Sequence, residues 1–383
     1  MTGNKRVYIR TFGCQMNVRD SEVIAGLLEK EGYKIIDEPD EADIVIFNTC
    51  SVRQLAEEKV WSGIGKIAKT RSKQLKGSSR KINTIPVIGI VGCMAQNYRE
   101  SIFERAPEVD FVVGTRDIAK IPKILKEIEK HKNSPYEKKI YETDADFREN
   151  EIYHTGFHLD KEHAFVVISE GCENYCSYCV VPFVRGALRH RPSEDILKEI
   201  KEDIAAGITK ITLLGQNVNS YPRFTELLRK VNDIDGLKQF SFVTSHPKDA
   251  SVELFKAMAE LEKLRKYLHL PIQSGSDRVL KLMNRGYTKE YYLELVKNYR
   301  RIVKGGELTS DIIVGFPSET EKDIQDTFDL VKEVKFNAAF IFKYSPRPHT
   351  AAASMPDDVP KEEKEKRHAL ILDLQLKISK GKK

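Results

Sequence analysis

Residues 165–179 read FVVISEGCENYCSYC, in which an apolar run leads directly into three closely spaced cysteines. Phe165–Ser169 has the β-branched and aromatic composition of a buried strand. Cys172, Cys176 and Cys179 follow it with the spacing C-x3-C-x2-C. Three thiolates this close in sequence can hold three irons of a [4Fe–4S] cluster and leave the fourth iron open to another ligand. The stretch therefore predicts a metal cluster at the carboxyl end of a strand.

A zinc site is the main alternative for these three cysteines, and unrelated buried thiols are another. A structural zinc ion needs a fourth Cys or His ligand at short spacing. The nearest histidines are His163 and His190, and neither completes a zinc pattern. The spacing therefore favours an iron–sulfur cluster.

Further strand candidates follow at regular intervals and alternate with amphipathic helical stretches such as Ser193–Ala206 and Glu321–Val334. Consecutive right-handed βα units wind in one direction and curl into a barrel. The sequence thus predicts an α/β fold with a partial (βα)6 barrel over residues 164–360, followed by a C-terminal helix within 361–383. The candidate barrel strands are Phe165–Ser169, Lys210–Leu214, Gln239–Thr244, Tyr267–Leu270, Thr309–Val314 and Ala339–Tyr344.

The N-terminal part, residues 1–130, is predicted to be a separate α/β domain with an open parallel sheet. The basic, serine-rich stretch Arg71–Lys81 is expected to be a surface loop. Residues 131–163 are polar and charged, so they are expected to form an irregular linker that could add one edge strand. The strand candidates are Val7–Thr11, Ile44–Asn48, Val87–Val91 and Asp110–Val113, and the helix candidates are Ser21–Glu31, Leu55–Thr70 and Tyr98–Ala106.

Three more cysteines are scattered along this N-terminal domain at positions 14, 50 and 93. Each lies two or three residues beyond the end of a predicted strand. In an open parallel sheet, the carboxyl ends of neighbouring strands line one crevice, so Cys14, Cys50 and Cys93 are expected to converge. Gly13 and Gly92 would let the backbone approach a bulky ligand without a Cβ clash. The alternative is that the cysteines are ordinary small core residues, but their equivalent placement favours a second metal site.

The bulk composition limits the classes to which the chain can belong. It has 383 residues with 63 basic and 57 acidic side chains, and the net charge of +6 is compatible with a polyanionic partner such as RNA. Six cysteines are too few for a disulfide scaffold. No apolar run approaches the length of a membrane span, and the N-terminus lacks the apolar core of a signal peptide. We therefore expect a cytoplasmic protein that does not enter a membrane.

The cysteine triad resembles that of the radical S-adenosylmethionine enzymes. The resemblance implies that S-adenosylmethionine chelates the open iron and is cleaved to a 5′-deoxyadenosyl radical. Ligand sites in such barrels lie at the carboxyl ends of the strands, and each candidate there could instead be a turn or capping residue. The candidates are Tyr178 and Glu319 near the adenine, Gln216 for the amine, Arg285 for the carboxylate, and Ser245 and Gln273 at further strand ends.

The rest of the chain resembles the methylthiotransferases, on motifs that span residues 5–379. The N-terminal motifs are GCQMN at 13–17, NTCSVR at 48–53 and GCM at 92–94, and the barrel motifs are VVPFVRG at 180–186, LGQNVNS at 214–220, HLPIQSG at 269–275 and DIIVGFP at 311–317. The first two motifs are most similar to the branch that acts on N6-dimethylallyl-adenosine in tRNA. The resemblance implies a second [4Fe–4S] cluster on Cys14, Cys50 and Cys93, with an open iron that holds the sulfur to be inserted. The family usually carries a C-terminal RNA-binding β-barrel, the TRAM domain, and we expect it to be absent here because the sequence stops at Lys383.

This resemblance implies an enzyme that replaces a C–H bond by C–SCH3 at C2 of the modified adenine next to the anticodon. The same chemistry on threonylcarbamoyl-adenosine or on an aspartate of a ribosomal protein is an alternative. A non-catalytic RNA-binding iron–sulfur protein is an alternative of another class. The implied partners are a tRNA anticodon stem-loop, an electron donor such as flavodoxin or ferredoxin, and a sulfur source, and we expect a monomer.

Basic side chains directly after the triad are candidates for RNA phosphate contacts. They are Arg185, Arg189 and Arg191, and a solvated basic loop is the alternative. The run Lys361–Arg367 is expected to be a solvated helix face. Gly63, Gly65 and Lys66 lack the spacing of a phosphate-binding loop. No catalytic residue is assigned beyond the cluster ligands.

Overall fold

The structure is a computed structural model that describes residues 5–51, 54–76, 86–131, 139–144 and 150–381. It divides into two compact units. Unit 1 comprises residues 1–159 and 183–186, and unit 2 comprises residues 160–182 and 187–383. Among the described helices, none combines the length and the apolar composition needed to cross a bilayer.

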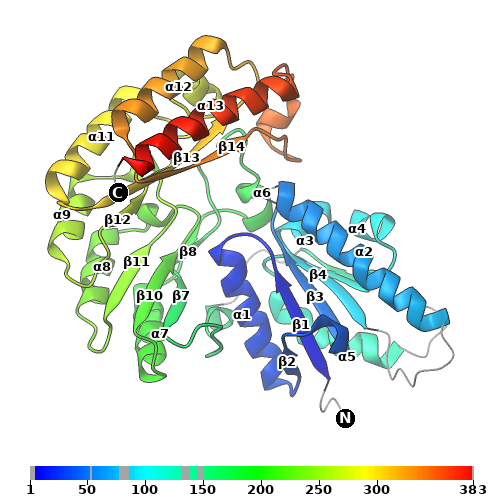
Figure 1. The fold of residues 1–383 in the computed structure, drawn as a ribbon. Helices are drawn as coiled ribbons and strands as arrows, with labels where there is room; N and C mark the ends of the chain where they lie inside the picture. The colour runs from blue at the N-terminus through cyan, green and yellow to red at the C-terminus, as the bar shows by residue number, and fades with distance from the viewer. Residues whose placement is uncertain (1–4, 52–53, 77–85, 132–138, 145–149, 382–383) are drawn as a thin grey trace. The chain divides into compact units, whose positions relative to one another are not determined.

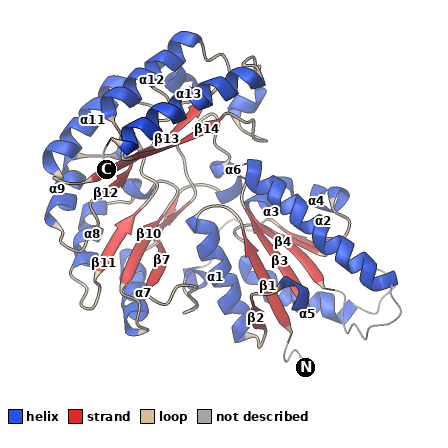
Figure 2. Ribbon diagram, viewed as in Figure 1, coloured by secondary structure: helices blue, strands red, loops and turns tan. Residues whose placement is uncertain are grey.

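Unit 1 is built on a parallel sheet of six strands in the order β2-β1-β3-β4-β5-β6 (Figure 1, Figure 2). Every residue of β3 and β4 is buried, as expected for central strands with helices on both faces. All four predicted strands are present, and β6 lies in the stretch that was expected to be a linker. The strands are β1 (Arg6–Thr11), β2 (Lys34–Ile36), β3 (Ile44–Thr49), β4 (Val87–Gly92), β5 (Phe111–Val113) and β6 (Ile140–Glu142).

Two apolar cores lie on the two faces of this sheet. Helices α1 (Gln15–Lys30) and α5 (Ile121–His131) contribute to one core, through side chains such as Val23 and Ile124. Three helices contribute to the other core, through side chains such as Val60 and Met94. They are α2 (Gln54–Lys76), α3 (Cys93–Tyr98) and α4 (Ser101–Arg105).

The helices of unit 1 differ from the prediction at three places. Helix α1 begins at Gln15 rather than at Ser21. The surface loop predicted for Arg71–Lys81 is wrong over residues 71–76, because these good helix formers continue α2, and residues 77–81 lie outside the described residues. The helix predicted at Tyr98–Ala106 is present only as α4, and α3, which was not predicted, ends at Tyr98 because Arg99 has a φ of 49° that an α-helix cannot contain.

Unit 2 contains all six predicted barrel strands, arranged as two parallel sheets with the orders β11-β10-β7 and β12-β13-β14 (Figure 2). One apolar core runs beneath both sheets, from Ala164 on β7 to Ile341 on β14, which makes them one partial barrel. An isolated bridge between Phe240 and Leu264 lies near the junction of the two sheets. The strands are β7 (His163–Val167), β10 (Lys210–Leu214), β11 (Gln239–Phe242), β12 (Tyr267–His269), β13 (Glu307–Val314) and β14 (Ala338–Lys343).

Helices cover the outer face of the partial barrel, as the alternation of strands and helices predicted (Figure 2). The short strands β8 (Ser169–Glu170) and β9 (Arg189–His190) pair antiparallel on either side of the cysteine triad in sequence. The helices are α7 (Ser193–Ala205), α8 (Phe224–Asn232), α9 (Val252–Glu260), α10 (Asp277–Leu282), α11 (Lys289–Ile302), α12 (Glu321–Val334) and α13 (Lys361–Lys380), and the short α6 (Val181–Arg185) follows the triad.

Candidate active site

The three cysteines of unit 1 lie at the carboxyl ends of three neighbouring strands. Cys14 precedes α1, Cys50 follows β3, and Cys93 begins α3 directly after β4. The strands β1, β3 and β4 are adjacent and parallel, and the register pairs Thr11 with Asn48 and Thr49 with Gly92. This register brings the three cysteines to one edge of the sheet, which is the expected arrangement.

The environment of Cys93 supports this convergence. Burial raises the pKa of the Cys93 thiol, the nearby charge of Arg185 opposes the rise, and the charge of Cys14 adds to it. Cys14 is exposed, whereas Cys50 and Cys93 are buried. Such a site exposes one thiol to solvent and shields the other two.

Two positions beside these thiols must be glycine. Gly13 has a φ of 117°, and a Cβ there would lie 2.4 Å from Cβ and 3.0 Å from Sγ of Cys50. Gly92 has a φ of 91°, and its Cβ would lie 2.5 Å from Oδ1 of Asn48 and 2.7 Å from the carbonyl of Thr49. Neither position has room for a side chain, so both glycines are required by the close approach of the cysteine loops.

A network of buried amides fixes the loops. Asn17 donates through Nδ2 to the carbonyl of Thr49 at 2.7 Å, and Asn48 donates through Nδ2 to the carbonyl of Asn17 at 2.8 Å. Oδ1 of Asn17 accepts a hydrogen bond from Sγ of Cys14 at 3.5 Å. The N-terminus of α1 and the end of β3 are therefore tied together beside Cys14 and Cys50.

Arg185 belongs to this site in unit 1. Its Nη2 lies 2.6 Å from Oδ2 of Asp20 and 3.5 Å from Oδ1 of Asn17, and its side chain also hydrogen bonds to Cys93. Because Arg185 is 4% exposed, its guanidinium is placed to steady the thiols rather than to meet solvent-borne phosphate. Sequence reasoning missed the roles of Asp20 and Asn17, since neither residue belongs to a metal-ligand pattern.

Two further polar side chains near these cysteines are buried and have no hydrogen-bond partner among the described residues. They are Ser51, which follows Cys50 and is fully buried, and Asn97, which is 8% exposed. Asn97 lies four residues after Cys93, on the same face of α3. Buried polar groups normally find partners, so these two side chains fit a site that receives a polar or charged group.

The cysteine triad of unit 2 is held by hydrogen bonds to distant segments. The backbone N–H of Ser177 donates to the carbonyl of Met283 at 3.0 Å, and Oγ of Ser177 donates to the carbonyl of Leu282 at 2.8 Å. Burial raises the pKa of Cys179 to about 12, and the charge of Cys176 adds to the rise. Crowded, desolvated thiols of this kind favour binding of a cation, which would remove the cost of their negative charges.

Arg285 is the buried cation beside this triad. Its Nη1 donates to Sγ of Cys176 and to Oη of Tyr178, each at 3.2 Å. Its Nη2 donates to the carbonyl of Pro271 at 3.0 Å, and its Nε donates to Oη of Tyr287 at 2.8 Å. The structure therefore brings together two predicted residues, Arg285 and Tyr178, at a predicted cluster ligand.

Polar atoms without partners surround the carboxyl ends of the barrel strands. Oε1 of Gln216, Oγ of Ser245 and Oε1 of Gln273 are buried and make no hydrogen bond to any residue that the structure describes. Nε2 of His246 is also unpartnered, while its Nδ1 accepts from the backbone N–H of Lys248 at 3.3 Å. These groups fit a polar cofactor such as an amino acid or a nucleoside, and His246 joins its neighbour Ser245 as a site candidate at the end of the third strand.

Glu319 has a defined structural contact. Its Oε2 accepts from the backbone N–H of Gly315 at 2.6 Å and from Nη1 of Arg367 at 2.9 Å, while its Oε1 has no partner. Arg367 also donates to the carbonyl of Glu319, and it is 7% exposed. Arg367 therefore anchors α13 on the loop after β13 and is not part of a fully solvated helix face.

The spacing of the thiols argues against zinc. Among the described residues, no three cysteine sulfurs all lie within 4.8 Å of one another. A zinc ion with bonds of about 2.3 Å to sulfur would draw its thiolates closer than this.

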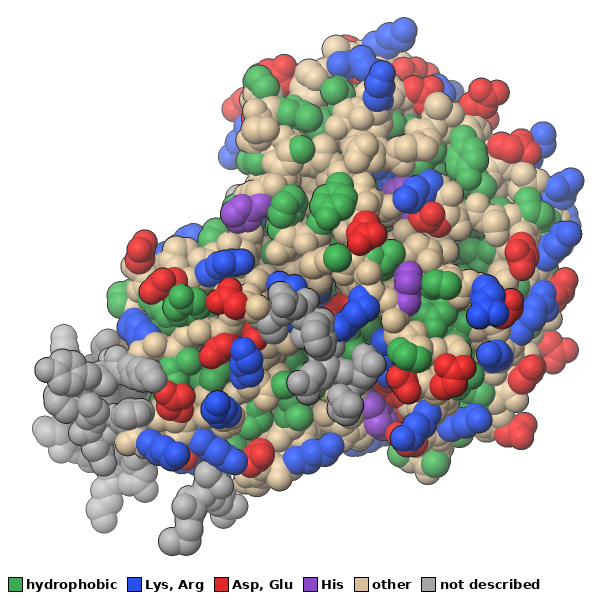
Figure 3. Space-filling model, turned by 180° about the vertical axis from the view of Figure 1, so that it is seen from behind, with side chains coloured by type: hydrophobic (Ala, Val, Ile, Leu, Met, Phe, Trp, Pro, Cys, Tyr) green, Lys and Arg blue, Asp and Glu red, His purple; other side chains and the backbone are tan. Residues whose placement is uncertain are grey.

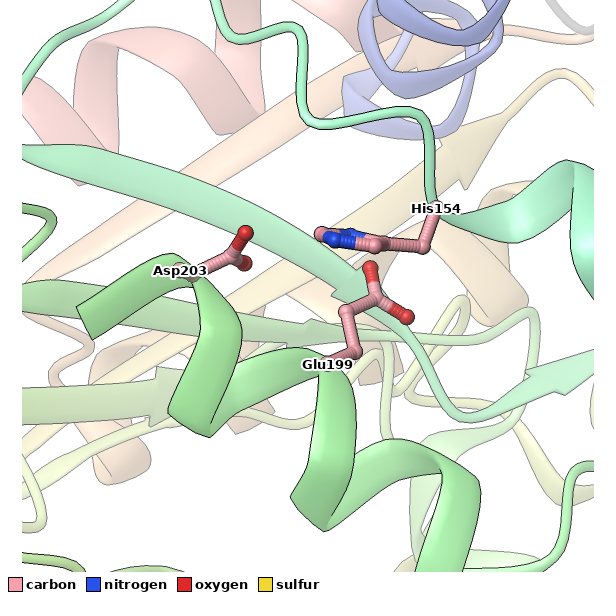
Figure 4. Close-up of side chains that lie close together, drawn as sticks. All are labelled: His154, Glu199 and Asp203. Atoms are coloured by element: carbon pink, nitrogen blue, oxygen red, sulfur yellow. The ribbon is translucent and has the colours of Figure 1, made fainter. Parts of the chain in front are cut away.

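The other two candidate RNA-binding arginines differ in their accessibility. Arg191 is 6% exposed, and its Nη1 donates to Glu199 and to the carbonyl of Val167, each at 2.6 Å. Glu199 and Asp203 lie one turn apart on α7 and are both buried (Figure 4). Arg189 is half-buried on β9, so it is the more accessible of the two.

On the face shown in Figure 3, Lys and Arg side chains are interspersed with Asp and Glu.

Known families and proteins are similar to this chain over most of its length. Residues 166–331 match the radical SAM superfamily, and residues 6–114 match an uncharacterised protein family, UPF0004. Proteins named tRNA-2-methylthio-N(6)-dimethylallyladenosine synthase are similar over almost the whole chain. The protein from Carboxydothermus hydrogenoformans is 44% identical over 98% of this chain and 84% of its own length, and that from Clostridium novyi is 46% identical over 97% of this chain and 81% of its own length.

Solved structures with the same fold are radical SAM enzymes. The methyltransferase TsrM from Kitasatospora setae, with tryptophan and an S-adenosylmethionine analogue bound, aligns with a TM-score of 0.64 over 91% of this chain and 75% of that one. The cobalamin-dependent enzyme OxsB aligns with a TM-score of 0.56 over 98% of this chain and 56% of that one. Both are 14% identical in sequence, so the likeness concerns the fold alone.

Proposed function

Because this chain belongs to the tRNA-2-methylthio-N(6)-dimethylallyladenosine synthase family of radical SAM enzymes, we propose that it attaches a methylthio group to C2 of N6-dimethylallyl-adenosine next to the tRNA anticodon. The chain is therefore a transferase that uses S-adenosylmethionine and iron–sulfur chemistry. The C2–H bond offers neither an acidic proton nor a leaving group, so acid–base catalysis alone is inadequate. When bound, S-adenosylmethionine and the clusters supply the radical, the methyl group and the site for sulfur.

In unit 2, Cys172, Cys176 and Cys179 would hold the cluster that binds S-adenosylmethionine. Arg285 orients Cys176 and Tyr178 through its hydrogen bonds to both. The unpartnered side chains Gln216, Ser245, Gln273 and His246 would bind the polar groups of the cofactor. The burial of the unpartnered atoms of these four side chains keeps them in fixed positions toward the cofactor.

A second cluster in unit 1 is the part of the proposal that distinguishes methylthiolation from simple cofactor cleavage. One observation carries it. Cys14, Cys50 and Cys93 meet at one sheet edge, and the surrounding residues leave no room for a side chain at Gly13 or Gly92. Three thiolates leave one iron of a cubane open, and that iron would hold the sulfur. Arg185 would act as a positioning residue through Cys93.

The substrate class follows from the family, and the other partners from the chemistry. An anticodon stem-loop presents the target base in a single-stranded loop, from which it can be splayed toward a reactive site. Of the three candidate arginines, Arg189 has the exposure to contact its backbone. The reaction also requires an electron donor such as flavodoxin or ferredoxin and a sulfur source, and we propose a monomeric enzyme that works in the cytoplasm.

Mass spectrometry of tRNA from a strain that lacks this gene tests the proposal. The methylthio group should disappear from N6-dimethylallyl-adenosine and should return when the gene is restored. An unchanged tRNA together with an altered ribosomal protein, or with altered threonylcarbamoyl-adenosine, would contradict the substrate. A purified, reduced protein that releases no 5′-deoxyadenosine from S-adenosylmethionine would instead be a non-catalytic iron–sulfur protein.

A further inference from the structure

The loop that carries the triad of unit 2 exposes one aromatic ring. Tyr175 lies directly before Cys176 and is 56% exposed, whereas Cys176 and Ser177 are buried. The other tyrosine of the loop, Tyr178, is held by Arg285 through its hydroxyl group. Tyr175 is therefore the ring in this loop that remains available to a ligand.

The backbone at Tyr175 is strained. Its φ of 44° lies in the left-handed region, which L-residues with large side chains adopt at a cost and which glycine adopts freely. Nδ2 of Asn284 holds the conformation by donating to the carbonyls of Asn174 at 3.2 Å and Tyr175 at 3.1 Å. Strain that the surrounding structure maintains at a functional loop points to a role for the side chain.

The rim of this loop also carries a positive charge. Lys248 is exposed in the segment that follows β11, at the carboxyl ends of the barrel strands. An exposed ring and an exposed cation bordering one site match the recognition of single-stranded nucleic acid, in which bases stack on aromatic rings and cations meet phosphates.

We propose that the ring of Tyr175 is a stacking platform for a base of the tRNA anticodon loop at the mouth of the radical SAM site. This inference rests on the proposed function and adds a substrate contact to it. The ring would hold the RNA loop in place beside Cys176, which is buried. If the ring instead bound an apolar protein partner, that binding would not depend on RNA.

Tyr175→Gly removes the ring and also relieves the backbone strain. The variant therefore tests the loss of the stacking contact without disturbing the fold of the loop. Its affinity for a short anticodon stem-loop RNA that contains N6-dimethylallyl-adenosine should fall by about 5- to 150-fold, as measured by fluorescence anisotropy. Iron content, melting temperature and RNA-independent release of 5′-deoxyadenosine should stay at wild-type values. Tyr175→Phe, which keeps the ring, should bind the RNA nearly as well as the wild type.

Tyr141→Ala is the matched control, because Tyr141 is an exposed tyrosine, 43% accessible, on the edge strand β6 of unit 1. It should leave RNA affinity unchanged. Wild-type affinity in Tyr175→Gly, or a joint loss of iron and affinity in that variant, would overturn the inference. If the wild-type protein itself neither bound nor modified the RNA, the proposed function would fail, and the inference with it.

Discussion

The guanidinium of Arg185 and the carboxylate of Asp20 form an ion pair of 2.6 Å, and each side chain is only 2% exposed. The two residues are 165 positions apart in sequence, yet both belong to unit 1 and to the edge of the sheet where Cys93 lies. Burying a charge pair is costly unless both partners are satisfied. Through this pair, the packing of residues 183–186 and the conformation of the loops that carry the cysteines depend on each other.

Arg185→Met should destabilise unit 1 strongly, because it removes the guanidinium that pairs with the buried carboxylate of Asp20. The expected loss in the free energy of unfolding is about 3–5 kcal/mol, measured by urea denaturation of the metal-free, reduced protein. Arg229→Met is the control, since Arg229 pairs with Glu260 at 3.1 Å with both side chains about half exposed. The control should lose less than about 1 kcal/mol, and equal losses in the two variants would contradict the account.

Gly13→Ala should abolish metal binding in unit 1 while sparing unit 2, because its Cβ would lie 2.4 Å from Cβ of Cys50. Iron per chain after anaerobic reconstitution should fall by about half. Gly32→Ala is matched to it, since Gly32 also has a positive φ of 85° but has nothing within 4 Å of an added Cβ. The control should lose only about 1 kcal/mol of stability and keep its iron; iron loss in both variants would assign the effect to strain instead.

Arg285→Met removes hydrogen bonds to Cys176 and Tyr178 from one side chain. Groups that support a metal ligand typically change activity by about 10- to 100-fold when they are removed. Reduced protein should therefore release 5′-deoxyadenosine from S-adenosylmethionine about 10- to 100-fold more slowly. Arg265→Met, which breaks an exposed ion pair with Glu307, should not change this rate. An undiminished rate in Arg285→Met would show that the guanidinium does not support the site.

His246 should make unit 2 less stable in acid. Burial, followed by the charges of Arg285 and Lys248, lowers its pKa from 6.5 to about 2. As the pH falls below about 6.5, the unfolded chain binds a proton that the folded chain rejects, so stability falls by about 1.4 kcal/mol per pH unit. Above that pH both states are neutral, and the contribution vanishes.

His246→Gln tests this dependence. Between pH 7 and pH 5, the wild type should lose about 2 kcal/mol more free energy of unfolding than the variant, measured by urea denaturation of the metal-free, reduced protein. Parallel losses in the two proteins would mean that the imidazole is protonated in the folded state.

The sequence was sufficient for the parts of the fold that depend on local patterns. Each predicted strand was found, because apolar β-branched runs bounded by glycine or polar residues are local signals. The position of a cysteine just beyond a strand end was enough to predict that Cys14, Cys50 and Cys93 converge. Helix α3 and the break between α3 and α4 were missed, because the left-handed conformation of Arg99 has no signature in the surrounding sequence.

Contacts between distant segments could not be predicted in this way. Arg185 was predicted to meet RNA phosphates from its position after the triad, whereas its ion pair with Asp20 depends on residues 183–186 packing with unit 1. That RNA contact stays a prediction, and the burial of Arg185 favours a positioning role. Asn97 was also missed, because what marks it is a buried side chain without a hydrogen-bond partner among the described residues, which only coordinates reveal.

The iron content and products of the variant with Cys14, Cys50 and Cys93 all replaced by alanine test the account most directly. After anaerobic reconstitution, the wild type should hold about eight irons per chain and this variant about four. The variant should still release 5′-deoxyadenosine but should form no methylthio group on tRNA. Retention of about eight irons, or continued methylthiolation, would contradict the assignment of a sulfur-holding cluster to unit 1.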